Sequence, residues 1–210
     1  YTLLKLLNDG TKNISAVEDP VEIRMLGINQ ISVNEKIGLN FASVLRALLR
    51  QDPDIILIGE IRDLKTAQIA LQASQTGHLV LASLHTNNAI GAVTRLVNLG
   101  CDKELIASCL HFVSAQRLIR KICSKCNSQN STTTRCTACN STGYQGRVAV
   151  HEVLKINNNL KNEIYSGRMN ILLQLSKQSG MKSLFENGME LVARKVTNTK
   201  EIQRQIGQQF

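Results

Sequence analysis

Two continuous aliphatic runs constrain the fold of this chain more than any other feature of its sequence. Residues 55–61 read IILIGEI, and residues 79–85 read LVLASLH. Each run has the length and the Val/Ile/Leu content of a parallel strand that is buried on both faces. Between them, Asp63 is a capping residue for a helix over residues 64–75. This strand–helix–strand order predicts an α/β fold with a doubly wound, mostly parallel sheet.

Hydrophobic periodicity predicts further elements on both sides of this unit. In chain order we expect a helix over residues 1–9, a short buried strand within residues 13–20, a strand at 30–33, a helix over 40–50, a helix ending at Gly100, a long helix from Asp102 to about Ile122, and a strand over 148–156. Two or three short helices should follow from residue 158, with breaks near Gly167, Gly180 and Thr197. We divide the chain into a core over residues 1–122, a cysteine-rich segment over 123–146, and a closing strand with C-terminal helices over 147–210.

The composition narrows the class of protein. Apolar residues make up 43% of the chain, whereas aromatic residues make up 3% and tryptophan is absent. An aliphatic core of this kind suits helices stacked on a sheet. No apolar stretch approaches the roughly 20 residues that span a bilayer, and YTLLKLLNDG lacks the charged region and the cleavage site of a signal peptide. We therefore expect a cytosolic protein.

The net charge of +9 is unevenly distributed along the chain. Between Glu104 and Glu152 there is no carboxylate. The basic residues of that stretch are Arg117, Arg120, Lys121, Lys125, Arg135 and Arg147. Such a stretch suits nucleic acid, anionic lipid, an acidic partner subunit or nucleotide phosphates. Nucleic acid is the weakest of these, because no aromatic residues are interleaved with the cations to stack on bases.

Polar residues stand at the carboxyl ends of both aliphatic runs. Glu60 follows Gly59 in the first run, and His85 and Thr86 end the second. A carboxylate at the tip of a buried parallel strand, with a polar sensor on the neighbouring strand, is how P-loop NTPases hold magnesium and read the γ-phosphate. Because Gly59 replaces the aspartate usual before such a glutamate, direct magnesium coordination from this strand is disfavoured. The structural alternative for Glu60 is an ion pair with Arg62.

Three carboxylates stand at the end of the strand predicted within residues 13–20, namely Glu18, Asp19 and Glu22. In isolation they are typical of an exposed acidic turn. If they lie beside Glu60 on a neighbouring strand, the same group becomes a candidate site for a metal ion and a water molecule.

Two histidines flank the second aliphatic run. His78 and His85 are seven residues apart, and an odd separation on a strand directs two side chains to opposite faces. We therefore do not expect them to share one ligand. His85, at the carboxyl end, is a candidate contact for a γ-phosphate or a neighbouring carboxylate, whereas His78, at the start, is more typical of a structural histidine.

Four of the six cysteines form two C-x-x-C pairs with nine residues between them: Cys123, Cys126, Cys136 and Cys139. Four thiolates in this pattern favour a tetrahedral zinc ion, and a site closed by four protein ligands predicts a structural metal rather than a catalytic one. A thioredoxin-type redox role is disfavoured, because neither pair opens a helix after a strand. Cys101 and Cys109 stand apart and are typical of buried, inert thiols.

Several long segments resemble a known family of ATPases. They are EDPVE, GINQISVNEKIGLNFASVLRALLRQDPDIILIGEIRD, TGHLVLASLHTNNAIGAVTRL, AQRLIRKIC and GYQGRVAVHEVL. These segments, within about residues 14–156, resemble the type II secretion and type IV pilus-assembly ATPases of the GspE/PilB family. The resemblance implies a RecA-like P-loop NTPase core with a small zinc-binding insertion and a helical C-terminal region. It also implies a homo-hexameric ring that hydrolyses ATP at its subunit interfaces.

The resemblance also implies roles for individual residues. The family's aspartate box falls on Glu18, Asp19 and Glu22, its Walker B strand on residues 54–60, and its histidine box on His78 and His85. We accordingly expect catalytic roles for Glu60, Glu18 and His85. Contacts with ATP or Mg²⁺ are expected from Asp19, Glu22, Asp54, Gly59, Arg62, His78 and Thr86. The zinc ligands are expected to be Cys123, Cys126, Cys136 and Cys139.

The phosphate-binding loop of such enzymes, G-x-x-x-x-G-K-[ST], does not occur in residues 1–210. In the family it precedes a helix that begins much like YTLLKLL, so the resemblance implies that Tyr1 falls just after it. We expect the 210-residue chain to bind ATP poorly and to hydrolyse almost none. The backbone amides and the lysine that hold the β- and γ-phosphates would be missing.

The function implied by the resemblance is that of a motor subunit. It would be cytoplasmic, and it would associate with the bacterial inner membrane through partners, an inner-membrane platform and cytoplasmic adaptor proteins, to drive protein secretion or pilus assembly. Two alternatives remain: a non-catalytic regulatory paralogue, and a zinc-containing nucleic-acid-binding module that uses the basic stretch over residues 117–147. A native lack of the phosphate-binding loop would favour the first, and salt-dependent DNA binding would favour the second.

Overall fold

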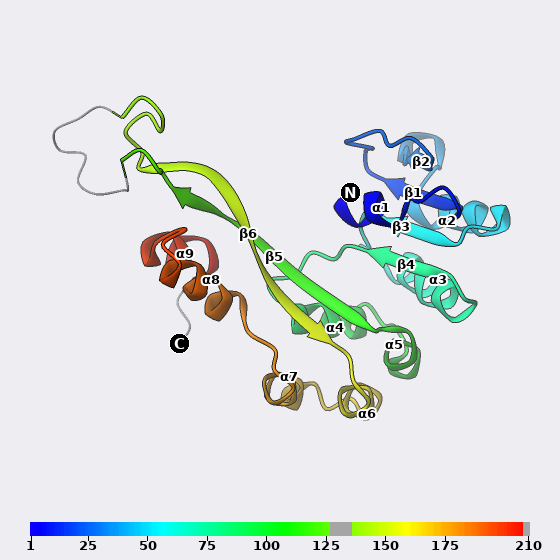
Figure 1. Cartoon of the computed structure of the whole chain (residues 1–210). Helices are drawn as coiled ribbons and strands as arrows, with labels where there is room; N and C mark the ends of the chain where they lie inside the picture. Colours follow the sequence, from blue (N-terminus) through cyan, green and yellow to red (C-terminus); the bar gives the residue numbers. More distant parts are fainter. Residues whose placement is uncertain (127–135, 208–210) are drawn as a thin grey trace. The chain divides into compact units, whose positions relative to one another are not determined.

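The computed structural model of the chain describes residues 1–126 and 136–207 (Figure 1). These residues belong to two compact units, which are described one at a time. Unit 1 comprises residues 1–86, 91–111 and 157–172, and unit 2 comprises residues 87–90, 112–156 and 173–210. Among the described residues, no helix is long and apolar enough to cross a membrane.

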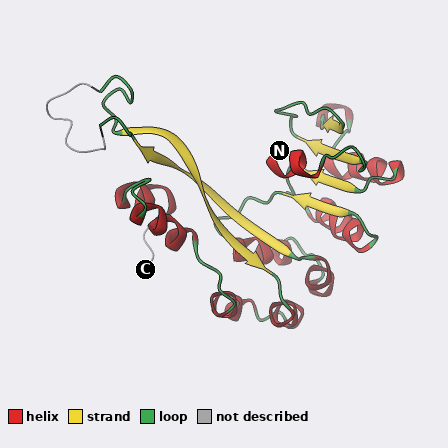
Figure 2. Ribbon diagram, viewed as in Figure 1, coloured by secondary structure: helices red, strands yellow, loops and turns green. Residues whose placement is uncertain are grey.

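Unit 1 contains a parallel sheet with the strand order β2-β1-β3-β4 (Figure 2). Its strands are β1 (Ile14–Glu18), β2 (Ile28–Ser32), β3 (Ile55–Ile58) and β4 (Leu79–Ala82). In the register, Ile14 lies opposite Ile28 on one side and Ile55 on the other. The chain passes from β1 outward to β2 and then returns to β3 on the far side of β1. The α/β fold class with its parallel sheet is therefore confirmed.

Capping residues place the helices of unit 1. These helices are α1 (Thr2–Leu7), α2 (Phe41–Leu48), α3 (Leu64–Gln75), most of α4 (Ala89–Asn98), α5 (Lys103–Cys109) and α6 (Asn158–Ser166). The Asp63 side chain accepts the Thr66 backbone N–H, so α3 begins where the sequence predicts. Asn40 and Ser43 form a capping box at the start of α2.

The core of unit 1 is aliphatic, as the composition indicates. Its fully buried side chains include Leu45 and Leu48 from α2 and Ile56 and Ile58 from β3. Short 3₁₀ turns occupy Glu35–Ile37, Leu49–Gln51 and Met169–Ile171. Successive residues of β3, and not only every second one, are buried or half-buried. This is expected for a parallel strand that is covered on both faces.

Unit 2 is built on a long antiparallel pair, β5 (Phe112–Ile122) and β6 (Tyr144–Lys155). Phe112 lies opposite Lys155, and a register shift interrupts the pairing between Arg120 and Ile122. The helices α7 (Leu172–Gln178, nearly all in this unit), α8 (Leu184–Ala193) and α9 (Thr199–Ile206) follow. Ser183 caps α8 and Asn198 caps α9.

The predicted long helix from Asp102 to about Ile122 is wrong. Asp102 does cap a helix, but this helix, α5, ends at Cys109, and residues 112–122 form β5. Within β5 the buried residues Ala115 and Ile119 alternate with more exposed neighbours, which is the two-residue period of a strand. The pairing that stabilises this strand comes from β6, which local periodicity does not reveal.

The C-terminal region contains one helix more than the upper end of the prediction, since the described residues include α6, α7, α8 and α9. The predicted breaks are confirmed. Gly167 closes α6 in the left-handed region, Gly180 has a φ of +87°, and Thr197 lies between α8 and α9. At Gly167 and Gly180 the positive φ favours glycine, which explains why these breaks are readable from the sequence.

Candidate functional site

The strand order of unit 1 defines the place where a ligand is expected. The order reverses between β1 and β3, and open α/β sheets bind ligands beyond the carboxyl ends of the strands at such a switch point. Glu18 is the last residue of β1, and Glu60 follows β3 by two positions. His85 follows the neighbouring strand β4. The structure thus brings the predicted carboxylates and one histidine to the same edge of the sheet.

Glu60 is the centre of this group. Its Oε1 accepts a hydrogen bond from Arg62 Nη2 at 2.5 Å, and its Oε2 lies 2.9 Å from His85 Nε2. Arg62 Nη1 also lies 3.8 Å from Asp19 Oδ2, so Arg62 joins carboxylates at the ends of β1 and β3. Glu60 is only 9% exposed, whereas the His85 side chain is 85% exposed. A buried carboxylate is therefore held by two solvent-accessible partners.

These contacts determine the charge of Glu60. Burial opposes its ionisation, but the hydrogen bonds from Arg62 and then His85 outweigh burial and leave the pKa of Glu60 below its ordinary value. The hydrogen bond to Glu60 raises the pKa of Arg62. Glu60 is consequently ionised at neutral pH, and it can orient a water molecule or accept its proton when an exposed partner moves aside.

Gly59 contributes close packing rather than a side-chain ligand. Its backbone N–H donates to Val17 O at 2.7 Å, and a Cβ at this position would lie 3.1 Å from both Glu18 Cα and Val17 O. Its carbonyl oxygen accepts a hydrogen bond from Ser83 Oγ. A side chain here would push β3 away from β1, so the close approach of the two strands explains the glycine.

Glu18 has a different environment from Glu60. It is buried, and its two carboxylate oxygens accept hydrogen bonds from the Tyr1 hydroxyl and from Gln30 Nε2, the latter at 2.9 Å. Burial, together with the hydrogen bond to Glu18, raises the pKa of Tyr1. Both oxygens of Glu18 are thus occupied by neutral donors, which suits a positioning carboxylate better than a base.

The two remaining carboxylates of the acidic turn are exposed, as are many charged residues of surface turns. Asp19 contacts Arg62 as described above. The backbone N–H of Glu22 donates to the Tyr1 hydroxyl at 3.2 Å, so Tyr1 links this turn to Glu18. No sequence pattern indicated Tyr1 or Gln30, because both lie in other elements and meet Glu18 only in the folded unit.

Two of the predicted residues lie at the opposite edge of the sheet. Asp54 precedes β3, and its Oδ2 accepts the Asn13 backbone N–H at 2.8 Å. His78 precedes β4, and its Nδ1 lies 2.9 Å from Ala73 O at the end of α3. The structure does not bring Asp54 or His78 to the Glu60 group, because both stand at the amino ends of their strands. Thr86 follows His85 in the same loop and is half-buried.

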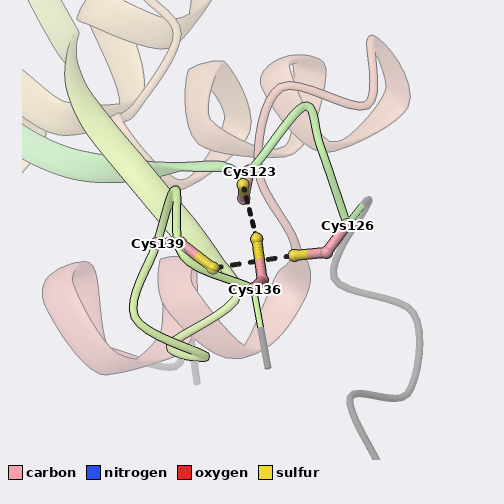
Figure 3. A group of neighbouring side chains, drawn as sticks. All are labelled: Cys123, Cys126, Cys136 and Cys139. Carbon is pink, nitrogen blue, oxygen red and sulfur yellow. Dashed lines mark hydrogen bonds between the residues drawn. The ribbon is translucent and has the colours of Figure 1, made fainter. Parts of the chain in front are cut away.

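The four clustered cysteines of unit 2 converge on one point (Figure 3). Cys123 Sγ lies 4.0 Å from Cys136 Sγ, Cys126 Sγ lies 3.7 Å from Cys139 Sγ, and all four sulfurs are within 4.8 Å of one another. Sulfurs bound tetrahedrally at about 2.3 Å from a zinc ion would lie about 3.8 Å apart, whereas a disulfide bond is about 2.05 Å long. The spacing fits four ligands of one metal ion.

The chain around the second cysteine pair shapes this cluster. Asn140 and Ser141 adopt φ values of +48° and +61°, and the Ser141 N–H donates to Cys136 O at 3.0 Å. Burial opposes ionisation of the Cys139 thiol, but hydrogen bonds from the Gly143 backbone and the other cysteines lower its pKa to about 7. A thiol that ionises near neutral pH is suited to binding a metal as a thiolate. Residues 127–135, between the two pairs, lie outside the described residues.

Glu152 is one of two buried carboxylates of unit 2 that sequence reasoning missed, the other being Glu201. Glu152 on β6 is 4% exposed, and its two oxygens accept backbone N–H groups from Ala89 at 2.7 Å and Leu184 at 3.2 Å. These are the first residues of α4 and α8, so one carboxylate caps two helices. The only available signal was a glutamate among aliphatic residues in VAVHEVL.

Comparisons with known proteins agree with the resemblance described above. The family model described as "Type II/IV secretion system protein" matches residues 1–204. The chain is 50% identical over 208 residues to the type II secretion system protein HxcR of Pseudomonas aeruginosa, covering 97% of this chain and 44% of that protein. It is 42% identical over 229 residues to the type IV pilus assembly ATPase PilB of Acinetobacter baylyi, covering 97% and 39%.

The crystal structure of the pilus retraction motor PilT with bound ADP superposes with a TM-score of 0.76 at 27% identity, covering 97% of this chain and 55% of that one. The chain spans less than half the length of the two curated relatives described. Family match, sequence identity and fold agree over nearly all of the 210 residues. The chain therefore belongs to the type II/IV secretion system protein family, as do the secretion and pilus-assembly ATPases that it resembles.

Proposed function

We propose that this chain carries the catalytic carboxylate of an ATP-hydrolysing motor subunit that drives type II secretion or type IV pilus assembly. The observation that carries the proposal is the environment of Glu60. It is an ionised, buried carboxylate at the switch point of a parallel sheet, and its two partners are exposed and free to rearrange. The relatives named above, one of which is a type IV pilus assembly ATPase, support the same class of reaction.

In this proposal Glu60 orients the attacking water and accepts its proton. Arg62 and His85 hold the carboxylate in place before ATP arrives, and either can turn toward a phosphate afterwards because both are largely exposed. Asp19 and Glu22 are exposed near this edge and would contact Mg²⁺ through water, while Glu18 keeps β1 and its turn in position. Mg²⁺ bound with ATP would neutralise charge that develops on the β- and γ-phosphates.

We also propose that Cys123, Cys126, Cys136 and Cys139 hold a structural Zn²⁺ ion. The distances among their sulfurs fit a tetrahedral site, and four protein ligands leave no position open for substrate. Such an ion would cross-link the segments that follow β5 and precede β6.

The remaining parts of the proposal follow the family. The subunit would work in the cytoplasm as a homo-hexamer, with an inner-membrane platform and cytoplasmic adaptor proteins as its partners. The names of the relatives, which place them in secretion and pilus-assembly systems, support this context.

The test is a Glu60→Gln substitution in the complete gene product that contains this chain. We expect nucleotide binding to persist and ATP turnover to fall by about 10²- to 10⁴-fold, the usual contribution of general-base catalysis. Glu104→Gln, which neutralises an exposed carboxylate at the start of α5, should leave turnover unchanged.

The outcomes separate the alternatives. Full turnover by the Glu60→Gln variant would exclude Glu60 as the base and direct attention to Glu18. A parent protein that binds ATP but turns over none would support a regulatory paralogue instead of a motor.

A further inference from the structure

Unit 2 carries the entire net positive charge of the chain. In unit 1 twelve lysine and arginine residues are balanced by twelve aspartate and glutamate residues. In unit 2 thirteen lysine and arginine residues meet only four glutamates, which accounts for the net charge of +9. Charge that is concentrated in one unit affects which partners its surface can bind, and it does not determine the fold.

Each of the four glutamates of unit 2 is already used inside the unit. Glu152 caps two helices, Glu186 forms the capping box with Ser183, Glu190 pairs with Lys182, and Glu201 lies between Arg120 and Arg204. None of the four is left to balance the other cations of unit 2.

Two of these cations line one pocket. A hollow of about 430 Å³ is bounded by Lys121, Ile122, Ser124, Gln145, Gly146, Lys195 and Val196. The Ile122 N–H donates to Val196 O at 2.9 Å, so the end of β5 is joined to the turn after α8 at this point. Lys121 and Lys195 are both exposed, and no described carboxylate lines this hollow, which we call the lysine pocket.

The backbone accommodates both lysines in unusual ways. Gly146 has a φ of +71°, which favours glycine, and a Cβ there would lie 3.2 Å from Lys121 Cε, so the Lys121 stem passes close to this glycine. Lys195 has a φ of +58° at the end of α8, where the Lys195 N–H donates to Val192 O and the Val196 N–H to Leu191 O. This is the helix-ending position that normally selects glycine. A cation near a helix C-terminus is favourable in itself, but that alone does not account for a lysine in the left-handed region.

We propose that the lysine pocket is a docking site for an acidic segment of a partner polypeptide. An aspartate or glutamate side chain would enter between Lys121 and Lys195, and further carboxylates would meet Arg147 and Arg194, which are exposed and adjacent in sequence to the lining residues. Hydrogen bonds between ammonium groups and carboxylates are of the strong, charge-assisted kind. The inference concerns unit 2 and does not depend on the role of Glu60.

The shape and chemistry of the pocket favour a polypeptide over a membrane or a nucleic acid. The pocket is concave, and its two apolar lining residues, Ile122 and Val196, are half-buried, so neither is placed to insert into a bilayer. No described residue that lines the pocket is aromatic, and the nearby Tyr144 ring already has one face against the Arg120 guanidinium, 4.1 Å from the ring centroid, so the pocket offers no aromatic platform for bases.

The experiment compares two double variants of the complete gene product that lose the same charge. Lys121→Gln with Lys195→Gly removes both ammonium groups from the lysine pocket. The glycine suits the left-handed backbone at position 195, so we expect folding to be preserved. Lys155→Gln with Lys177→Gln removes two exposed cations elsewhere in unit 2. The probe is a fluorescent deca-glutamate peptide at physiological salt, read by anisotropy.

We expect the pocket variant to bind the peptide about tenfold more weakly and the control variant to lose less than twofold. Equal losses of affinity in both variants would overturn the proposal, because they would indicate that the peptide responds to the overall positive charge of unit 2 and not to the lysine pocket. Phosphatidylglycerol vesicles and an oligo-dT strand serve as alternative probes. If the pocket variant loses affinity for either of these but keeps its affinity for the peptide, the polypeptide partner is wrong.

Discussion

Substituting Glu201 by glutamine tests how much one buried ionic network contributes to unit 2. The Glu201 side chain is fully buried. Its oxygens accept hydrogen bonds from Arg204 at 2.7 and 2.8 Å and from Arg120 at 2.6 and 3.0 Å, and the Arg120 backbone N–H adds a fifth at 3.1 Å. The Arg204 hydrogen bond is the largest influence, and together these donors outweigh burial and lower the pKa of Glu201 to about 2.

The lowered pKa of Glu201 determines how much its ionised form stabilises the folded protein and how that contribution changes with pH. Each tenfold change in proton affinity is worth about 1.4 kcal/mol, so a fall from 4.5 to about 2 corresponds to about 3 kcal/mol of stability. Arg120 and Arg204 are about half exposed and regain water in the variant, so we expect Glu201→Gln to lower the free energy of unfolding by about 2–3 kcal/mol at pH 7. Because the folded-state pKa is lowered, this contribution is complete above the unfolded-state pKa and is lost as the pH falls toward about 2.

The assay is urea-induced unfolding of both proteins, followed by circular dichroism at pH 7, 5.5 and 3. The difference between them should be the same at the two higher pH values and clearly smaller at pH 3. Glu163→Gln, which breaks the more solvent-exposed pair with Arg168, should have a smaller effect. An unchanged stability at pH 7, or a difference that grows at pH 3, would refute the reasoning.

Two further predictions concern the metal and the nucleotide. Cys136→Ser should release the zinc that we propose, whereas Cys109→Ser, outside the cluster, should retain it. The measurement is zinc per chain by elemental analysis, and a full complement of zinc in the Cys136→Ser variant would contradict the site. A protein that consists of residues 1–210 alone should bind a fluorescent ATP analogue only weakly, because these residues contain no phosphate-binding loop. Stoichiometric, tight binding would show that this loop is dispensable.

Local patterns predicted many of the elements of unit 1 correctly. The α3 helix begins directly after Asp63 because the Asp63 side chain accepts the backbone N–H of Thr66, only three residues away. The strands β3 and β4 and the four clustered cysteines are likewise encoded over short distances, as a continuous aliphatic run and as two C-x-x-C pairs. In each case the signal lies within a few residues of the structure that it specifies.

Prediction failed where the decisive partner is distant in sequence. In the sequence of residues 112–122 apolar and polar residues alternate only weakly. These residues form β5 because β6 pairs with them. The tertiary structure also adds where Asp54 lies: the resemblance groups it with Glu60 in one strand segment, and because β3 lies between them the two stand at opposite ends of that strand.

By itself, the sequence determined the α/β class and the family, and it indicated Glu60, His85 and the four clustered cysteines as candidate site residues. The tertiary structure decided most of the partners that these carboxylates have. The partners of Glu60 are Arg62 and His85, and those of Glu18 are Tyr1 and Gln30. One partner of Glu201 is an arginine 81 positions away. The physical reason is that a carboxylate's charge and pKa depend on the donors packed around it. Arg62, two positions after Glu60, and Arg204, three positions after Glu201, are local donors, but the others come from contacts between elements that no local pattern contains.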